Sequence, residues 1–129
     1  MAFDLSQLFS LDGRIALVTG ASRGIGNWIA GGLLSRGAKV YIVGRKPEAC
    51  EAAARELGPG SAALPGDISS TEGRKAIFEQ LSARESKLDI LVNNAATNWT
   101  APFETYPEHG WDKVMNVNVK SLFFMTTTL

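Results

Sequence analysis

The sequence predicts an α/β domain built on a doubly wound parallel sheet. Four short apolar runs that favour strands recur along the 129 residues, at positions 14–19, 39–43, 61–64 and 89–93. The second and fourth runs show no polar alternation, which is typical of strands buried on both faces. A longer segment with apolar residues at helical spacing follows each run. Repeated β–α units of this kind form a parallel sheet with helices on both faces and right-handed crossovers.

A glycine-rich turn follows the first strand. The turn reads Thr19-Gly20-Ala21-Ser22-Arg23-Gly24-Ile25-Gly26 and leads into a helix over positions 24–36. The free amides of the first helical turn and the helix dipole make such a junction an anion site. We assign Gly20 to the tight turn, Gly24 to close approach of a phosphate and Gly26 to close packing of the helix on its strand. The turn alone is a weak signal, and an ordinary strand–turn–helix is the alternative.

Start and stop signals separate the later helices. A second helix begins at Pro47, which suits a first helical turn, and it stops before Gly58. Ser70 or Thr71 caps a third helix. The last helix starts near position 107 and runs to the end of the chain.

This order of elements is that of the Rossmann-type, dinucleotide-binding architecture, for which we expect the strand order 3-2-1-4. A ligand should then lie beyond the carboxyl ends of the first and fourth strands, where the order reverses. The sequence stops inside the fourth helix. We therefore expect the architecture to be truncated there, with residues 1–129 forming the dinucleotide-binding part of a single domain.

Two apolar patterns predict how the N-terminal part packs. Positions 1–13 form a lead-in that ends in a turn at positions 11–13, and we expect one or more of its apolar side chains to pack against the domain: Phe3, Leu5, Leu8 or Phe9. Three apolar residues at helical spacing share one face of the first helix: Ile25, Ile29 and Leu33.

Composition excludes several classes of function. Thirteen basic residues balance thirteen acidic ones, so no overall field attracts nucleic acid or an anionic membrane. Cys50 is the only cysteine, which excludes an intramolecular disulfide, and its apolar helical surroundings predict a buried, inert thiol. His109 is the only histidine, and we expect no metal site. Neither a signal peptide nor a membrane span is predicted, which favours a cytoplasmic protein.

The end of the second strand distinguishes the two nicotinamide dinucleotides. A fold of this kind that binds NAD normally carries an acidic residue about 20 residues past the glycines. Here the sequence reads Val43-Gly44-Arg45-Lys46. The guanidinium of Arg45 can bind a 2′-phosphate with a forked pair of hydrogen bonds, and Arg23 can approach the same phosphate from the glycine turn. Two arginines and no acid predict NADP(H); the alternative is that both are solvated turn residues, and Lys46 is interpreted as a bystander.

Four motifs in order resemble the short-chain dehydrogenase/reductase family. The glycine turn has the family's TGxxxGIG spacing, and Asp67-Ile68 resembles its adenine-contacting aspartate region. Asn93-Asn94-Ala95-Ala96 resembles its NNAG turn, with Ala96 where glycine is usual. Asn118 matches the asparagine of its fourth helix. Within the family, the stretch 9–18 is most similar to bacterial NADPH-dependent β-ketoacyl reductases, including the rhamnolipid-associated type.

The resemblance implies an oxidoreductase that transfers hydride between NADPH and a small carbonyl or hydroxyl substrate such as a 3-oxoacyl thioester. Together with the strand-end arginines it gives the expected cofactor-binding residues: Gly20, Ser22, Arg23, Gly24, Ile25, Gly26, Arg45, Asp67, Ile68, Asn93 and Ala95. It also implies that Asn118 supports a water in proton relay to a catalytic lysine. The side-chain amides of Asn93 and Asn94 can fix backbone geometry or meet the ribose. Local turn-making is the alternative for Asp67 and for both asparagines, and capping of a neighbouring backbone group is the alternative for Asn118.

The family's serine and Tyr-x-x-x-Lys pair have no counterpart in these residues. The two tyrosines are Tyr41 and Tyr106, and neither has a lysine four residues later. We therefore predict no activity from these residues alone, and the alternative function is a non-enzymatic nucleotide-binding or interaction fragment. Substrate identity, reaction direction and oligomer size remain open.

The last helix carries two apolar faces. One stripe has 4-3-4-3-4 spacing: Trp111, Met115, Asn118, Leu122, Met125 and Leu129. A second, largely apolar face consists of Val114, Val117, Ser121 and Phe124. A helix that is apolar on two sides is typically buried on two sides. The family resemblance implies that this helix packs on the sheet and against a partner subunit, so we expect a homo-oligomer, dimer or tetramer, formed through it; partial disorder is the alternative. Asn116 lies off the stripe, and no role is assigned to it.

Overall fold

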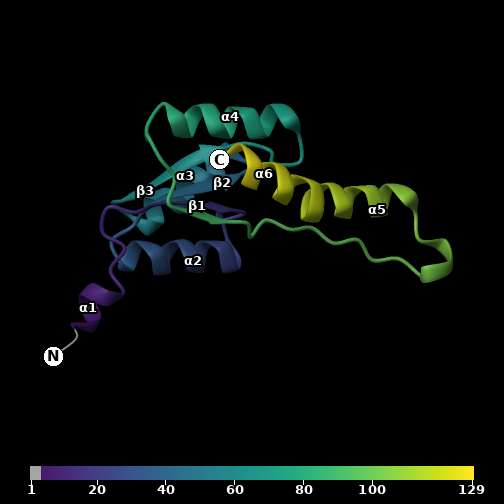
Figure 1. Ribbon diagram of the computed structural model, residues 1–129. Coiled ribbons are helices and arrows are strands. Elements are labelled where there is room, and N and C mark those ends of the chain that lie inside the picture. Colours follow the sequence, from purple (N-terminus) through teal and green to yellow (C-terminus); the bar gives the residue numbers. More distant parts are fainter. Residues whose placement is uncertain (1–3) are drawn as a thin grey trace.

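The computed structural model describes residues 4–129 and shows a four-stranded parallel sheet with helices on both faces (Figure 1). The strand order is β3-β2-β1-β4, as predicted. The strands are β1 (Ile15–Thr19), β2 (Lys39–Gly44), β3 (Ser61–Pro65) and β4 (Ile90–Val92). The helices are α1 (Leu5–Leu8), α2 (Gly24–Ser35), α3 (Pro47–Leu57), α4 (Thr71–Ser82), the 3-10 helix η1 (Phe103–Thr105), α5 (Glu108–Met115), the π-helix η2 (Asn116–Ser121) and α6 (Leu122–Thr128).

The two faces of the sheet form two apolar cores. Successive residues of a strand point to opposite faces, so Leu17 packs with the core under α4 and α6, whereas Val18 packs with the core under α2 and α3. Both side chains are fully buried, as both faces of the sheet are covered. Ser70 caps α4 by accepting a hydrogen bond from the amide of Gly73 at 3.0 Å, as expected. No helix in residues 4–129 is long and apolar enough to cross a membrane.

Three of the four lead-in side chains do not pack as predicted. Leu5, Leu8 and Phe9 are each more than 60% exposed, and Phe3 lies outside the described residues. Backbone carbonyls hold this segment instead, because the guanidinium of Arg36 donates to the carbonyl of Phe9 at 3.0 Å and also reaches that of Ser6. Leu5 and Leu8 share a face of the four-residue helix α1, but no side chain of this helix is buried.

The face of α2 also differs from the prediction at its first position. Ile25 is 66% exposed, while Ile29 and Leu33 are partly buried against the sheet. The helix turns its small residues Gly26 and Ala30 to the sheet. Ile25 lies one residue, or about 100°, away from Gly26 and therefore points outward.

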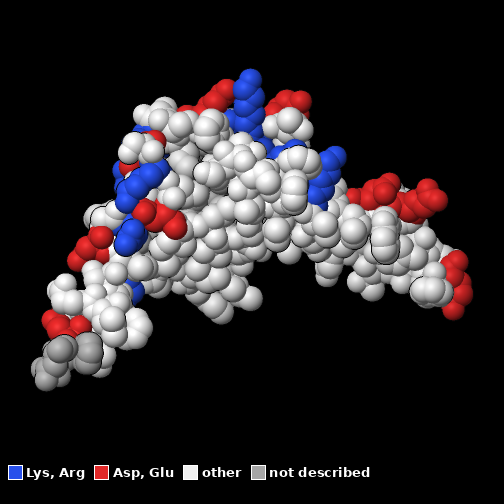
Figure 2. Space-filling view, viewed as in Figure 1, with Lys and Arg blue, Asp and Glu red and all other residues white. Residues whose placement is uncertain are grey.

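The last predicted helix is continuous but includes one π-helical segment, η2, between α5 and α6 (Figure 1). A π-helical turn inserts an extra residue and rotates the register of the following turn. The predicted stripe is buried only near its end: Trp111, Met115 and Leu122 are exposed, whereas Met125 is buried. On the second face Ser121 is fully buried and Val114 and Val117 are partly buried, but Phe124 is exposed. Figure 2 shows acidic side chains near the free end of α5 and few charges over the middle of this view.

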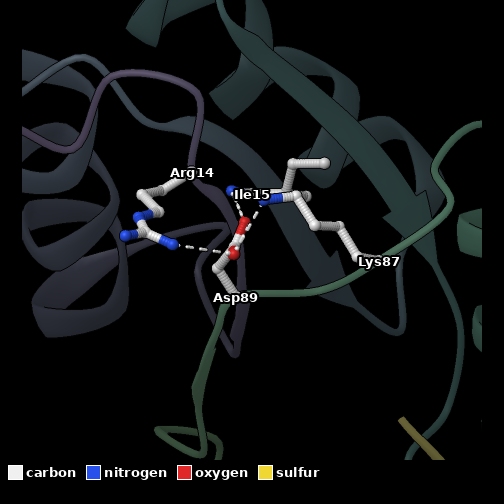
Figure 3. A network of polar contacts seen from close by, with 4 residues as sticks. All are labelled: Arg14, Ile15, Lys87 and Asp89. Carbon is white, nitrogen blue, oxygen red and sulfur yellow. Dashed lines mark hydrogen bonds and ion pairs between the residues drawn. The ribbon is translucent and has the colours of Figure 1, made fainter.

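A carboxylate fastens β4 to the amino end of β1 (Figure 3). One oxygen of Asp89 accepts a hydrogen bond from the backbone N–H of Ile15 at 2.8 Å. The other oxygen lies 2.9 Å from the ammonium of Lys87 and 3.3 Å from the guanidinium of Arg14. The amide of Asp89 in turn donates to the carbonyl of Ile15. These partners, led by the Ile15 amide, lower the pKa of Asp89 to about 2.

This network predicts acid sensitivity. A carboxylate whose pKa is lower in the folded chain stabilises it above the unfolded pKa of about 3.9, and that stabilisation is lost as the pH falls toward about 2. Asp89→Asn should lower the free energy of unfolding at pH 7 and flatten its dependence on pH between about 4 and 2. Denaturant titrations across this range measure both effects, with the exposed Asp112→Asn as the matched control. An unchanged acid profile in Asp89→Asn would contradict the assignment.

Candidate functional site

A cleft of about 480 Å³ opens at the carboxyl ends of the strands, where the order of the sheet reverses. This is the position predicted for a ligand, beyond the carboxyl ends of the first and fourth strands. The start of α2, the loops after β2, β3 and β4, and the α5–η2 region form its walls. Its lining residues are Gly20, Ser22, Arg23, Gly24, Val43, Gly44, Arg45, Gly66, Asp67, Ile68, Ser69, Asn94, Ala95, Ala96, Thr97, Lys113 and Val117.

The glycines of the turn are used in three different ways. Gly20 has φ +68° and Gly24 has φ +60°, a conformation that other residues rarely adopt. A side chain at Gly24 would meet nothing within 4 Å, so this position leaves open space beside the backbone. A Cβ at Gly26 would lie 2.6 Å from the carbonyl oxygen of Gly20. The helix therefore approaches its strand as closely as predicted.

Thr19 and Asn94 join the glycine turn to the turn after β4. The fully buried hydroxyl of Thr19 accepts hydrogen bonds from the amides of Asn94 and Ala95, both at 3.0 Å. The side-chain amide of Asn94 donates back to the carbonyl of Thr19 at 2.9 Å. Asn94 thus fixes backbone geometry, one of the two roles expected for this asparagine pair, whereas the side-chain amide of Asn93 donates to the hydroxyl of Thr126 and Asn93 does not line the cleft. The sequence signal for this link is Thr19 itself, a hydrogen-bonding residue at the end of an otherwise apolar strand.

Positive charge predominates along the cleft. Arg23 and Arg45 line it and are exposed, and neither guanidinium forms an ion pair within residues 4–129. Lys113, which the sequence analysis did not select, adds a third cation from α5 and lies 5.4 Å from the ring centre of Trp99. Asp67 is the one carboxylate among the lining residues. The cleft is thus electrostatically suited to an anionic ligand.

The loop after β3 is a compact hydrogen-bonded turn. The carboxylate of Asp67 accepts from the amide of Ser69 at 2.9 Å and from its hydroxyl at 2.7 Å. Asp67 makes this turn, as its alternative role predicts, and it also lines the cleft, so its contact with adenine stays a prediction. Ile68 is buried beside it.

Of the other predicted cofactor-binding residues, Ser22 and Ala95 line the cleft, whereas Ile25 and Gly26 do not. Asn118 does not line it either. Its side-chain oxygen accepts from the amide of Thr97, and its side-chain amide donates to the carbonyl of Thr97, both at 2.9 Å. The geometry is that of the capping alternative, and the catalytic role implied by the resemblance stays a prediction.

The cysteine and the two tyrosines lie outside the cleft and have structural contacts. Burial raises the pKa of the Cys50 thiol, which is fully buried beneath Gly44, as expected for an inert cysteine. The hydroxyl of Tyr41 donates to Glu85, and that of Tyr106 donates to the carbonyl of Trp99. Neither tyrosine lines the cleft. No cluster of His, Cys, Asp and Glu within residues 4–129 is arranged to hold a metal ion.

The close approach at Gly26 predicts a sharp difference between two glycines of α2. Gly26→Ala should cost roughly 1–3 kcal/mol of unfolding free energy, because the new methyl group overlaps the backbone of the turn. Gly32→Ala places its methyl group in open space in the same helix and should stabilise the protein by up to about 1 kcal/mol. Chemical denaturation of both variants measures the difference. Equal stabilities would show that the close approach carries no energetic weight.

Comparison with known proteins gives consistent matches. A family model described as short chain dehydrogenase matches residues 14–129. The rhamnolipids biosynthesis 3-oxoacyl-[acyl-carrier-protein] reductase of Pseudomonas aeruginosa is 52% identical over 117 residues, which cover 89% of this chain and 46% of that protein.

Two solved structures are also similar. The Pseudomonas aeruginosa RhlG/NADP active-site complex has a TM-score of 0.91 and 50% identity, covering 94% of this chain and 48% of that one. The 3-ketoacyl-(acyl-carrier-protein) reductase from Brucella melitensis complexed with NADH has a TM-score of 0.87 and 36% identity, covering 93% of this chain and 50% of that one. The chain therefore spans about half the length of these relatives.

Proposed function

This chain belongs to the short-chain dehydrogenase family, and from that premise we propose that it is the NADP(H)-binding portion of an oxidoreductase. The whole enzyme would transfer hydride between NADPH and a carbonyl or hydroxyl substrate. The observation that carries the proposal is the cleft at the glycine turn, which combines open backbone at Gly24 with three cations and a single carboxylate. A dinucleotide needs both features, since its phosphates must reach backbone amides and its charge must be balanced.

Several lining residues would hold the dinucleotide. The amides around Ser22 and Gly24 at the start of α2 would bind the pyrophosphate. Asp67 and Ile68 would lie beside the adenine, as the family resemblance implies. Ala95 would meet the ribose side of the cleft. When bound, NADPH supplies the hydride of the reaction.

The two arginines favour NADP(H) over NAD(H). At the end of β2, where an acidic residue would accept from the ribose hydroxyls of NAD, this chain has Arg45. Arg23 lines the same cleft from the glycine turn. Both side chains are free to form charge-assisted hydrogen bonds with a 2′-phosphate. Among the similar structures, two are described as NADP complexes and one as an NADH complex, so the residues at this strand end carry the assignment.

For the substrate we propose a 3-oxoacyl thioester. Support comes from the 52% identity with a 3-oxoacyl-[acyl-carrier-protein] reductase, which exceeds that of the sugar-acid dehydrogenases, at 34–38%. The cleft contains no tyrosine to protonate a carbonyl oxygen. Activity is accordingly proposed for the whole enzyme and not for these residues alone.

A non-enzymatic nucleotide-binding or interaction fragment remains the second candidate, and the commitment of Tyr41 and Tyr106 to other contacts favours it for this chain alone. In either case we propose homo-oligomerisation through the last helix. Its exposed apolar residues Trp111, Met115 and Leu122 support that association.

Cofactor preference is tested by titrating NADP and NAD against the protein. NADP should bind more tightly, and Arg45→Asp should weaken NADP roughly tenfold or more, because it replaces charge-assisted hydrogen bonds with repulsion. Lys46→Asp makes the same charge change one residue later, outside the cleft, and should have a smaller effect. Tighter binding of NAD by the parent chain would overturn the NADP assignment.

Activity is tested on protein whose intact mass has been measured. A verified 13.8 kDa chain should bind NADP but should not reduce a 3-oxoacyl thioester with NADPH, because it lacks the proton donor. A gene product of about twice that mass should carry the missing half and reduce it. Loss of NADPH absorbance measures the reaction. Turnover by the verified short chain would contradict the prediction, and failure to bind NADP would favour an interaction fragment.

A further inference from the structure

Two asparagines of the π-helix η2 reach opposite walls of the cleft. Asn116 donates its side-chain amide to the carbonyl of Ser69, in the loop after β3, at 3.1 Å. Asn118 holds both backbone groups of Thr97, in the loop after β4. Side chains two residues apart on a helix do not share a face, so one short segment can hold two loops. Ser69 and Thr97 both line the cleft.

The carbonyl groups of the loop after β3 show why the bond from Asn116 matters. The carbonyl of Asp67 accepts from the amide of Ser70, and that of Ile68 accepts from the guanidinium of Arg74 at 2.7 Å. Both donors belong to the loop or to α4. The carbonyl of Ser69 receives its hydrogen bond from Asn116, 47 positions later in the sequence. Within residues 4–129 this is the hydrogen bond that joins the α5–η2–α6 rod to the loop.

Arg74 of α4 gives the loop a second link to the same rod. The side chain is buried and donates to the carbonyl of Ile68, and its guanidinium lies 5.3 Å from the ring centre of Phe124 in α6, a cation–π contact. This contact holds the loop near α6 but does not reach the carbonyl of Ser69. The directional contact is the hydrogen bond from Asn116.

We propose that Asn116 is a positioning residue for the adenosine half of the nucleotide. It fixes the Ser69 peptide and, through the turn that Ser69 makes with the Asp67 carboxylate, the wall formed by Asp67 and Ile68. Asn116 does not itself line the cleft and acts through this loop. The inference rests on the proposed function, because it assigns this wall to the adenosine half.

The test uses adenosine 2′,5′-bisphosphate as the probe, since it contains the adenosine half of NADP with its 2′- and 5′-phosphates and lacks the nicotinamide half. Asn116→Ala should weaken its binding roughly threefold to tenfold, the effect of one lost hydrogen bond. Val119→Ala, an exposed change in the same π-helix, should leave binding unchanged. Calorimetric titration gives the dissociation constants, and far-UV circular dichroism verifies that each variant is folded.

The outcomes separate the inference from the proposed function. Absence of probe binding by the parent chain would overturn the proposed function itself. Parental affinity in a folded Asn116→Ala would overturn the positioning role alone, even if its melting temperature fell. Should Asn116→Ala fail to fold, the side-chain amide resonances of Asn116 are followed in the parent chain during titration. A shift on binding supports the role, and its absence overturns it.

Discussion

The close approach of α2 to β1 at the glycine turn is the constraint on which the cleft depends. Gly26 permits it, because any side chain there would collide with the turn. The hydroxyl of Thr19 and the side-chain amide of Asn94 then fasten the turn after β4 to the same point. Since the cleft lies between these two turns, its shape follows from a few buried hydrogen bonds at the carboxyl ends of β1 and β4.

The opposite side of the cleft depends on one helical rod. The segment from α5 to α6 packs on the sheet through Ser121 and Met125. Its π-helical part contains the two asparagines that hold the flanking loops. The π-helical turn therefore lies where the rod forms its hydrogen bonds to the two loops, and π-helical turns are common at functional sites. The same two asparagines thus hold the rod to the loops and shape the walls of the cleft.

Much of the fold and part of the site could be predicted from sequence. Apolar strands, capping residues and glycine spacing are local signals, so the four strands, their order and the cleft at Gly20, Arg23 and Arg45 follow from them. What could not be predicted concerns tertiary contacts. The exposure of Leu5 and the hydrogen bond from Asn94 to Thr19 depend on which neighbours a side chain meets, and no spacing rule contains that information.

The central position of β1 has a consequence for how the chain is made. Its neighbour β4 follows about 70 residues later, and the Asp89 carboxylate that receives the Ile15 amide is 74 positions away. On the ribosome, β2 and β3 can pair with β1 in sequence while the other edge of β1 remains open. An apolar strand with an unpaired edge invites pairing with another chain. Until β4 emerges, β1 therefore has an edge at which another chain can pair.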